Sequence, residues 1–183
     1  MKRYKVLQKQ IYSENTYSLV PIRFEDRMVI MKWRNEQIYH LRQSKLLTEE
    51  DQKNYFKNVV SKLFDQEQPD QILFSFLKNG ECIGYGGLVH INWVDKNAEI
   101  SFIMDTELEN DLFHAFWSQY ISLIEIVAFN EISLHKLYVY AFDLRPHLYE
   151  VLDRNNYFLD ARLKEQCFFN GEFIDVVIHS KIV

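Results

Sequence analysis

The chain has 183 residues, of which 48% are hydrophobic and 15% aromatic, and its net charge is -5. This length and composition fill one core, so we expect a single domain over residues 1–183. A negative chain without a concentrated basic stripe is unsuited to binding nucleic acid. The basic N-terminus lacks the uninterrupted apolar region of a signal peptide, which favours a cytoplasmic location.

The first third of the chain is predicted to form a strand and two helices. Residues 17–23 alternate and are rich in β-formers, and Met28, Met31 and Ile38 then follow at helical spacing. The second helix begins at the sequence Thr-Glu-Glu-Asp of residues 48–51, which has the spacing of a capping box. Its apolar residues continue on one face to about Phe64.

Three antiparallel strands are predicted next. Residues 72–77 and 82–91 flank Asn79 and Gly80, a dipeptide whose tolerance of positive φ makes a tight hairpin turn. A further turn leads to a strand over residues 98–104, antiparallel to the strand before it. Cys82, within this hairpin, and Cys167 are isolated thiols, so no disulfide framework and no metal site is expected.

The last part alternates helices and strands. A long helix is predicted from about Glu107 to Phe129; it is apolar enough to raise a membrane question, but its regularly placed polar residues indicate no membrane partner. A strand over residues 137–142 precedes a short helix, for which Asp143 is the candidate N-cap.

The short helix carries Pro146 in its first turn, where proline is tolerated. It can end at Asn155 and Asn156, because asparagine accepts the left-handed conformation. A closing hairpin is predicted over residues 161–182, with its turn at Asn170 and Gly171.

The segment between the strand at 98–104 and the long helix is acidic and contains no glycine. Residues 105–111 read Asp-Thr-Glu-Leu-Glu-Asn-Asp, and no lysine or arginine occurs from 97 to 135. One interpretation is structural, because Thr106 and Glu109 have capping-box spacing and carboxylates suit the first turn of a helix. The other is that backbone amides at the helix start hold an anion while the carboxylates point outward.

The order of elements and the residues at their junctions resemble the GNAT superfamily of acyl-CoA N-acyltransferases. The best local matches are to the branch that includes the ribosomal-protein alanine and spermidine acetyltransferases. They are Ile22-Arg-Phe-Glu-Asp26 with Trp33-Arg-Asn35, then Glu81-Cys-Ile-Gly-Tyr-Gly-Gly87, then Ala98-Glu-Ile-Ser-Phe102, then Asn170-Gly171 with Asp175. The resemblance implies an α/β (α+β) fold whose mixed, mostly antiparallel sheet has about seven strands and about four flanking helices.

The resemblance also implies acetyl-CoA as cosubstrate and names residues for it. Backbone amides of the fourth strand, at Phe102, Ile103 and Met104, would polarise the thioester carbonyl. The start of the long helix, at Asn110 and Asp111, and Arg145 would contact the phosphates. The family has a glycine-rich basic loop where this chain has residues 105–111, and this departure bears directly on cofactor binding.

Two residues are candidates for catalysis. Glu99 corresponds to a base in the family, and the alternative for it is a cross-strand ion pair. Tyr149 lies on the last helix, where the family places a general acid, and a phenol can protonate a thiolate. A half-buried core aromatic is the alternative for Tyr149.

The acceptor site is expected beside the first helix and the third predicted strand. Trp33, Arg34 and Asn35 end the helix that forms one wall of this site in the superfamily, although Trp33 can also be a core residue. His90 and Trp93 approach the turn before Glu99. His90 could act as a base near neutral pH.

The sequence thus predicts an N-acetyltransferase that modifies a primary amine. The acceptor stays open between a protein N-terminus, a polyamine and an amino sugar, and the acidic surroundings favour a cationic amine. A homodimer is a further candidate partnership. The rival hypothesis is a GNAT-fold binding module that has lost CoA binding, which the acidic, glycine-free segment supports.

Overall fold

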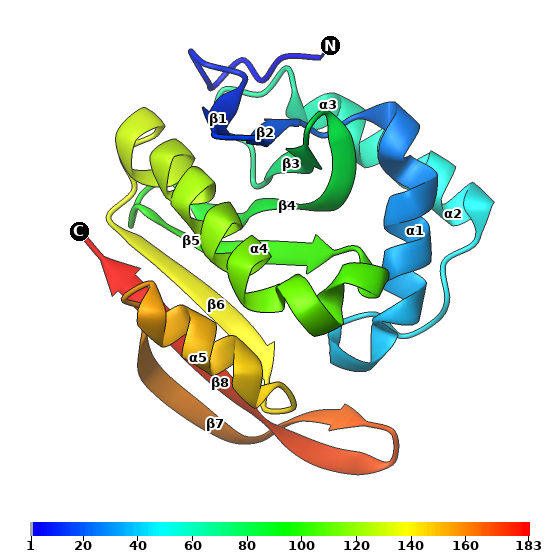
Figure 1. The fold of residues 1–183 in the computed structure, drawn as a ribbon, viewed down its shortest axis with the longest axis vertical. Helices are drawn as coiled ribbons and strands as arrows, with labels where there is room; N and C mark the ends of the chain where they lie inside the picture. The colour runs from blue at the N-terminus through cyan, green and yellow to red at the C-terminus, as the bar shows by residue number, and fades with distance from the viewer. Residues whose placement is uncertain (1) are drawn as a thin grey trace.

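The computed structural model describes residues 2–183, apart from the side chain of Asp111. One eight-stranded sheet in the order β1-β2-β3-β4-β5-β6-β8-β7 forms its centre (Figure 1). Neighbouring strands are antiparallel except β5 and β6, which are parallel. The strands are β1 (Tyr12–Glu14), β2 (Tyr17–Pro21), β3 (Ile72–Lys78), β4 (Glu81–Asn92), β5 (Asn97–Met104), β6 (Lys136–Phe142), β7 (Phe158–Phe169) and β8 (Glu172–Ile182).

The expected mixed, mostly antiparallel sheet is therefore confirmed, with one strand more than the seven expected. The additional strand β1 forms a hairpin with β2 around Asn15, which has a φ of 53°. Sequence analysis missed it because the turn lacks the asparagine-glycine pair. At the two turns that have this pair, Asn79 and Asn170 adopt φ values of 51° and 49°, as predicted.

The helical segments flank the sheet. The α-helices are α1 (Arg27–Glu36), α2 (Glu49–Tyr55), α3 (Ser61–Leu63), α4 (Glu109–Glu125) and α5 (Pro146–Arg154). Short 3-10 segments are η1 (Phe24–Asp26), η2 (Ile38–His40) and η4 (Thr106–Leu108), and π-helical segments are η3 (Phe56–Val60) and η5 (Ile126–Glu131). Because α2, η3 and α3 run on without a break, the sequence-based division into four helices is confirmed.

Helices cover both faces of the sheet. On one face, Tyr120 of α4 stacks on Phe102 of β5, with ring centroids 3.9 Å apart. On the other, Arg34 of α1 donates a 2.8 Å hydrogen bond to the hydroxyl of Tyr85 in β4. Successive side chains in a strand point to opposite faces. The two faces are therefore an α4/α5 face, in front in Figure 1, and an α1/α2 face.

Helix α4 packs close to the sheet because Gly86 leaves room for it. A Cβ atom at Gly86 would lie 2.0 Å from the carbonyl oxygen of Ser101 and 2.6 Å from the hydroxyl of Tyr120, so no other residue fits without displacement. By length and composition alone, Leu112–Glu131 is apolar enough to cross a membrane. In this fold its residues Phe116, Tyr120, Leu123 and Val127 are buried in the core.

The helix termini agree in part with the sequence analysis. Thr48 and Asp51 form the predicted capping box, and Pro146 occupies the first turn of α5. Asn156, with a φ of 64°, follows the end of α5 as expected. The predicted capping box of Thr106 and Glu109 is wrong, because the Thr106 hydroxyl donates instead to Glu36 of α1.

Asp143 was also wrongly predicted to cap α5. The N-cap position belongs to Arg145, whose side chain makes no capping hydrogen bond. Asp143 instead accepts a 2.7 Å hydrogen bond from the Tyr149 hydroxyl and pairs with Arg162 of β7.

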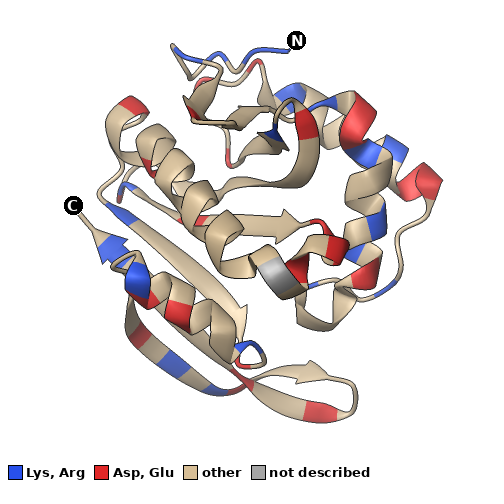
Figure 2. Cartoon of the chain, viewed as in Figure 1, with Lys and Arg blue, Asp and Glu red and all other residues tan. Residues whose placement is uncertain are grey.

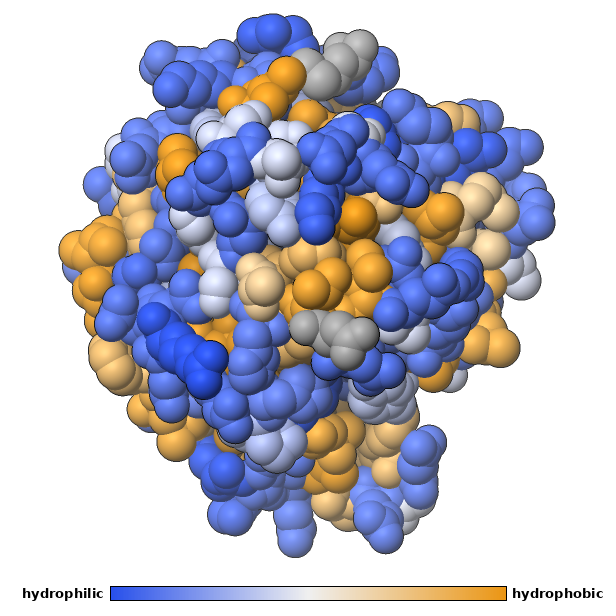
Figure 3. Space-filling model, viewed as in Figure 1, coloured by the Kyte–Doolittle hydropathy of each residue, from blue (hydrophilic) through white to orange (hydrophobic). Residues whose placement is uncertain are grey.

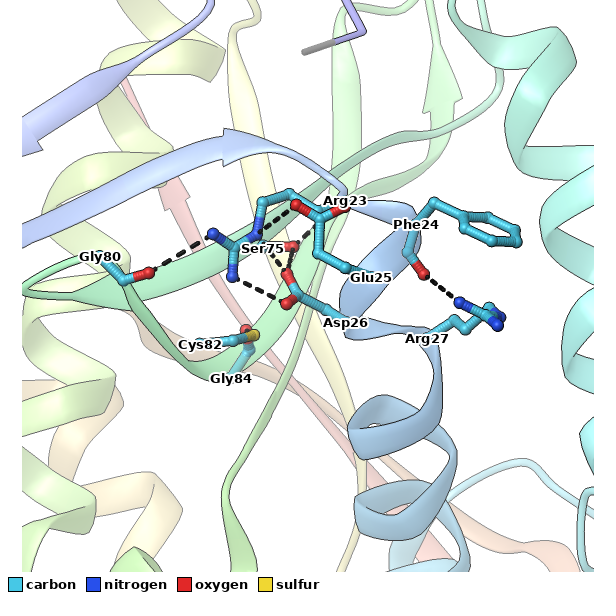
Figure 4. Close-up of polar contacts among 9 residues, drawn as sticks. All are labelled: Arg23, Phe24, Glu25, Asp26, Arg27, Ser75, Gly80, Cys82 and Gly84. Atoms are coloured by element: carbon cyan, nitrogen blue, oxygen red, sulfur yellow. Dashed lines mark hydrogen bonds and ion pairs between the residues drawn. The ribbon is translucent and has the colours of Figure 1, made fainter.

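A buried polar network fixes the start of α1 against β3 (Figure 4). Arg23 contacts both carboxylate oxygens of Asp26 at 2.7 Å, and the Ser75 hydroxyl donates to the same carboxylate at 2.6 Å. Beside them, burial raises the pKa of the Cys82 thiol to about 12, and both Cys82 and Cys167 are free.

The β7–β8 hairpin presents hydrophobic side chains to the surface. Phe168 and Phe173 are 66% and 63% exposed and pair across the strands with ring centroids 5.0 Å apart. Hydrophobic colour accordingly appears at the lower end of the space-filling view, where the hairpin lies (Figure 3). Strand β7 is the edge of the sheet.

Candidate active site

The candidate site is a cleft where β5 and β6 separate. Their ladder covers only residues Asn97 to Glu99 opposite Lys136 to Tyr138, after which β6 stays with β8 and the strands diverge (Figure 1). Beyond Glu99, the β6-facing backbone edge of β5 has no strand partner within residues 2–183. Such an edge offers amide donors and carbonyl acceptors to an extended ligand.

A cavity of about 100 Å³ lies between the two strands where they separate. A cavity of this volume has room for several water molecules. The walls come from β5, β6, α4, α5 and the loop of residues 37–48, called here the α1–α2 loop. The lining residues are His40, Leu41, Arg42, Glu99, Ile100, Ser101, Phe102, Ile103, Trp117, Val139, Tyr140, Ala141, Phe142, Arg145 and Leu148.

The cavity spans the sheet from one face to the other. Phe102 stacks on α4, so its neighbours Ser101 and Ile103 point toward the α1/α2 face, and Glu99 shares their alternation. Trp117 and Leu148 line the cavity from the α4/α5 face. A donor and an acceptor could therefore approach the same gap from opposite faces.

Glu99 is the buried carboxylate of this cleft. Its side chain is 6% exposed and forms an ion pair with Arg42 of the α1–α2 loop, and His90 Nε2 lies 3.9 Å away. The Arg42 guanidinium also lies over the Tyr140 ring, 4.7 Å from its centroid. Burial raises the pKa of Glu99 above its usual value, while Arg42 and His90 oppose that rise.

Arg145 is the buried cation of the cleft. Its Nη2 lies 3.2 Å from Glu109, and its Nη1 lies 3.0 Å from both ring nitrogens of His40. The guanidinium also lies 5.0 Å from the Phe113 ring centroid. Its buried Nε has no hydrogen-bond partner among the described residues. This donor could take an anionic ligand.

His40 is held neutral beside Arg145. Burial first, and the Arg145 charge second, lower the pKa of His40 to about 3. A neutral imidazole can accept from Arg145 through one nitrogen and donate through the other to Gln37 Oε1, which lies 3.2 Å from Nε2.

Two carboxylates of the acidic segment, Glu107 and Glu109, are paired with cations of other elements, and Asp105 is engaged by backbone amides. Asp105 accepts the Glu107 amide at 3.1 Å through its carboxylate and the Leu108 amide at 3.0 Å through its carbonyl. Glu107 pairs with Lys32 of α1 at 3.2 Å, and Glu109 with Arg145. Figure 2 shows red acidic residues of this segment between β5 and α4, next to positive residues of α1.

These contacts decide how CoA fits. The unpaired edge of β5 and the Arg145 Nε suit a pantetheine arm and a phosphate. The segment after β5 does not offer the usual grip on a diphosphate, because the Asp105 carboxylate already satisfies an amide that an anion would take. The predicted contact of the phosphates with the start of α4, at Asn110 and Asp111, stays a prediction; the Asp111 side chain lies outside the described part of the chain, and Asn110 lines a separate pocket with His114 and His147.

The other predicted cofactor residues divide by position. Phe102 and Ile103 line the cleft. The Met104 carbonyl accepts a 2.8 Å hydrogen bond from Gln37, a buried residue at the end of α1.

Tyr149 is engaged by residues outside the cleft lining. Its hydroxyl donates to Asp143, and its ring stacks on His179 with centroids 5.2 Å apart. Burial raises the pKa of Tyr149, which makes it a weaker acid. Tyr149 is absent from the described cleft lining, and its catalytic role stays a prediction.

The predicted acceptor residues are scattered. His90 lies beside Glu99, whereas Trp33 is 3% exposed in the core and Trp93 donates to the carbonyl of Pro69 at 2.9 Å. Asn35 donates to the Leu47 carbonyl and so anchors the α1–α2 loop. Arg34 borders a second cavity of about 310 Å³.

Sequence analysis missed Arg42, Tyr140 and Gln37. Arg42 and Tyr140 surround Glu99, and Gln37 holds the end of β5 through Met104 and Thr106. Arg42 lies in a loop without hydrophobic periodicity. The only clue in the sequence was that a carboxylate on a buried strand face needs a counter-ion.

Comparison with known proteins identifies the fold. A family profile described as an acetyltransferase (GNAT) domain matches residues 19–178. The spermidine N-acetyltransferase from Vibrio cholerae, solved in complex with CoA and spermine, is similar with a TM-score of 0.78 at 16% identity, covering 92% of this chain and 96% of that one. RimL, a ribosomal alpha-N-protein acetyltransferase, is similar with a TM-score of 0.75 at 16% identity, with 94% of each chain covered.

Proposed function

The chain belongs to the GNAT acetyltransferase family, and on that premise we propose that it transfers an acetyl group from acetyl-CoA to the primary amine of a cationic acceptor. The observation that carries the proposal is the opening between β5 and β6, which holds a buried carboxylate, Glu99, and an unpartnered buried donor, Arg145 Nε. The acceptor of a protein with this fold, spermidine, is also a polycation.

Bound acetyl-CoA supplies a thioester; the amine forms a C–N bond to its carbonyl carbon, the C–S bond breaks, and the sulfur leaves with one amine proton. Glu99 takes the other proton of the arriving ammonium. Because burial raises the pKa of Glu99, this carboxylate is a stronger base than an exposed one. The amides on the unpaired edge of β5, at Phe102 and Met104, are the donors for the thioester carbonyl, whereas the predicted Ile103 amide faces β4, where Ile103 is paired with Tyr85.

Arg145 is the residue we assign to the phosphates, through Nε. The Asp105 carboxylate takes the place of an anion at the start of the helical segment, so Arg145 carries more of the phosphate binding than it would beside a glycine-rich loop. We keep the cytoplasm as the proposed location, because the free thiols suit a reducing compartment.

Ligand-induced stabilisation tests the cosubstrate. Acetyl-CoA should raise the melting temperature of the wild type, since a ligand that binds only the folded state stabilises it. Arg145→Lys keeps a charge for Glu109 but lacks Nε, and should lose most of the shift. Arg154→Gln, at an exposed position of the same helix, is the control and should keep it.

Thiol release from acetyl-CoA in the presence of amines tests the reaction. A shift with amine-dependent thiol release supports the enzyme. The second candidate function is a binding module without CoA, which the Asp105 contact to the Glu107 amide favours. Absence of any shift at millimolar acetyl-CoA, in a wild type that unfolds cooperatively, would establish that alternative and overturn the acetyltransferase.

A further inference from the structure

Arg42 holds Glu99 in an arrangement that resembles a bound ligand. The carboxylate of Glu99 is almost fully buried, whereas the side chain of Arg42 is 47% exposed and comes from a loop 57 residues away. The guanidinium rests on the Tyr140 ring at 4.7 Å. A carboxylate and an aromatic face together form a cation site.

Apart from Arg42, no described neighbour of Glu99 forms a close ion pair with its carboxylate. His90 Nε2 is 3.9 Å away, beyond hydrogen-bond distance. Tyr138 of β6 lies close enough for Glu99 to raise the pKa of its hydroxyl, although burial is the larger cause. Removing the partner of a buried charge costs several kcal/mol, so Glu99 requires a cation from some source.

We propose that Arg42 is an internal competitor that occupies the ammonium site of the acceptor, and that the acceptor is a primary alkylammonium able to displace it. This inference rests on the proposed acetyl transfer. The exchange replaces one cation with another on the same carboxylate, so Glu99 does not lose its pairing. The site therefore selects a compact cation on an apolar stem over a neutral amine.

The exchange also changes what Glu99 can do. A guanidinium does not give up its proton at physiological pH, whereas an alkylammonium can. While Arg42 is in place, its charge lowers the pKa of Glu99 and weakens it as a base. Displacement of Arg42 thus leaves Glu99 paired with a cation that can be deprotonated. The α1–α2 loop must move outward, which also enlarges the cavity.

The size of the effect follows from occupancy. If the competitor fills the site about nine-tenths of the time, the apparent dissociation constant of the acceptor is raised about tenfold. Arg42→Gln keeps a hydrogen-bond donor near Glu99 but removes the charge, and should tighten acceptor binding about tenfold. Arg42→Lys keeps a competing cation and should remain close to the wild type.

Calorimetric titration with 1,4-diaminobutane tests the inference directly, with 1,4-butanediol as the uncharged probe. Lys45→Gln is the control on the same loop, because Lys45 contacts Asp51 and not Glu99. We expect tighter diamine binding in Arg42→Gln, unchanged binding in Lys45→Gln, loss of binding in Glu99→Gln, and no butanediol binding in any of them.

Equal diamine affinity in wild type and Arg42→Gln would overturn the inference, as would equal tightening by Arg42→Lys. Weaker binding in Arg42→Gln would mean that Arg42 supports the site instead of competing for it. To separate failure of this inference from failure of the proposed function, the shift in melting temperature caused by acetyl-CoA is measured on the same samples. A normal shift with unchanged diamine affinity rejects only the competitor, whereas a missing shift rejects the acetyltransferase.

Discussion

Two buried carboxylates in this chain, Asp26 and Glu99, each pair with an arginine, yet they differ in how completely they are satisfied. Asp26 receives two contacts from Arg23, three residues away, and one from the Ser75 hydroxyl (Figure 4). Glu99 is held chiefly by Arg42, on a half-exposed loop. A local, saturated pair serves the fold, whereas a buried charge with a removable partner can exchange it for a ligand.

The largest effect is expected when the pair between Asp26 and Arg23 is broken. Asp26→Asn should lower the free energy of unfolding by about 3–5 kcal/mol, because it leaves the partly buried Arg23 without its counter-ion. Urea unfolding measures the loss. Glu25→Gln is the control, since Glu25 is 70% exposed and lies 3.7 Å from the same arginine, and it should change stability by about 0–1 kcal/mol. Equal losses in both variants would contradict the distinction.

At Glu99 we expect the opposite result, a large loss of activity with a small change in stability. Glu99→Gln should lower kcat/KM for the acceptor about 100-fold, since a general base is lost. Its unfolding free energy should change less than in Asp26→Asn, because the arginine left without a counter-ion, Arg42, is 47% exposed and stays solvated, whereas Arg23 is 24% exposed. Steady-state kinetics and urea unfolding on one preparation check both. If stability fell by several kcal/mol while turnover survived, Glu99 would belong with Asp26 as a structural residue.

The α1–α2 loop also contacts Arg145 through His40, and this contact should make the free energy of unfolding depend on pH. The folded pKa of His40, about 3, lies below its unfolded value of about 6.5, so the folded state binds fewer protons between them. The contribution of His40 is therefore present above pH 6.5 and is lost as the pH falls. Between pH 6.5 and 5 the loss is about 2 kcal/mol.

Comparison with His40→Gln isolates this loss, because the raised pKa values of Glu99 and Glu109 act with the opposite sign. The wild type should lose more stability than the variant on acidification. His135→Gln, at an exposed position, controls for removal of a histidine. Parallel losses in wild type and His40→Gln would show that the loop is not held by a neutral imidazole.

The smallest effect is expected at Tyr149. Tyr149→Phe removes one hydrogen bond to Asp143, which keeps Arg162, and should cost about 1 kcal/mol of stability. Because the hydroxyl is bound to Asp143 and Tyr149 is not among the described residues that line the cleft, kcat should fall less than about threefold, far below the effect of removing a general acid. A 100-fold loss of kcat would instead support Tyr149 as the acid that the sequence suggested.

Local chemistry explains which features were predictable from sequence. Asn79 and Asn170 mark their turns because positive φ is a property of the dipeptide itself. Thr106 failed as a capping residue because Glu36 and Gln37, seventy and sixty-nine residues earlier, take its hydroxyl. These tertiary contacts determine the hydrogen bonds of Thr106, and a rule based on sequence spacing does not include them.

The same limit applies to the candidate site. Glu99 could be found from its strand and its family resemblance, but Arg42 lies 57 residues earlier in a loop without a repeating pattern. The Tyr149 hydroxyl binds Asp143, which also pairs with Arg162 of β7, and the sequence of α5 alone does not reveal these contacts. Residues of regular elements were therefore easier to assign than their partners.

The α1–α2 loop is fastened on both sides of the cleft, to Arg145 through His40 and to Glu99 through Arg42. Moving the loop costs free energy, and this cost can be shared by the binding of the donor and the binding of the acceptor. If the proposed donor, like the proposed acceptor, binds only when the loop moves, whichever ligand detaches the loop first spares the second that cost, and the two bind with positive cooperativity. By thermodynamic linkage each must raise the affinity of the other by the same factor. Titrations of acetyl-CoA with and without diamine, and the reverse, have to return one coupling constant.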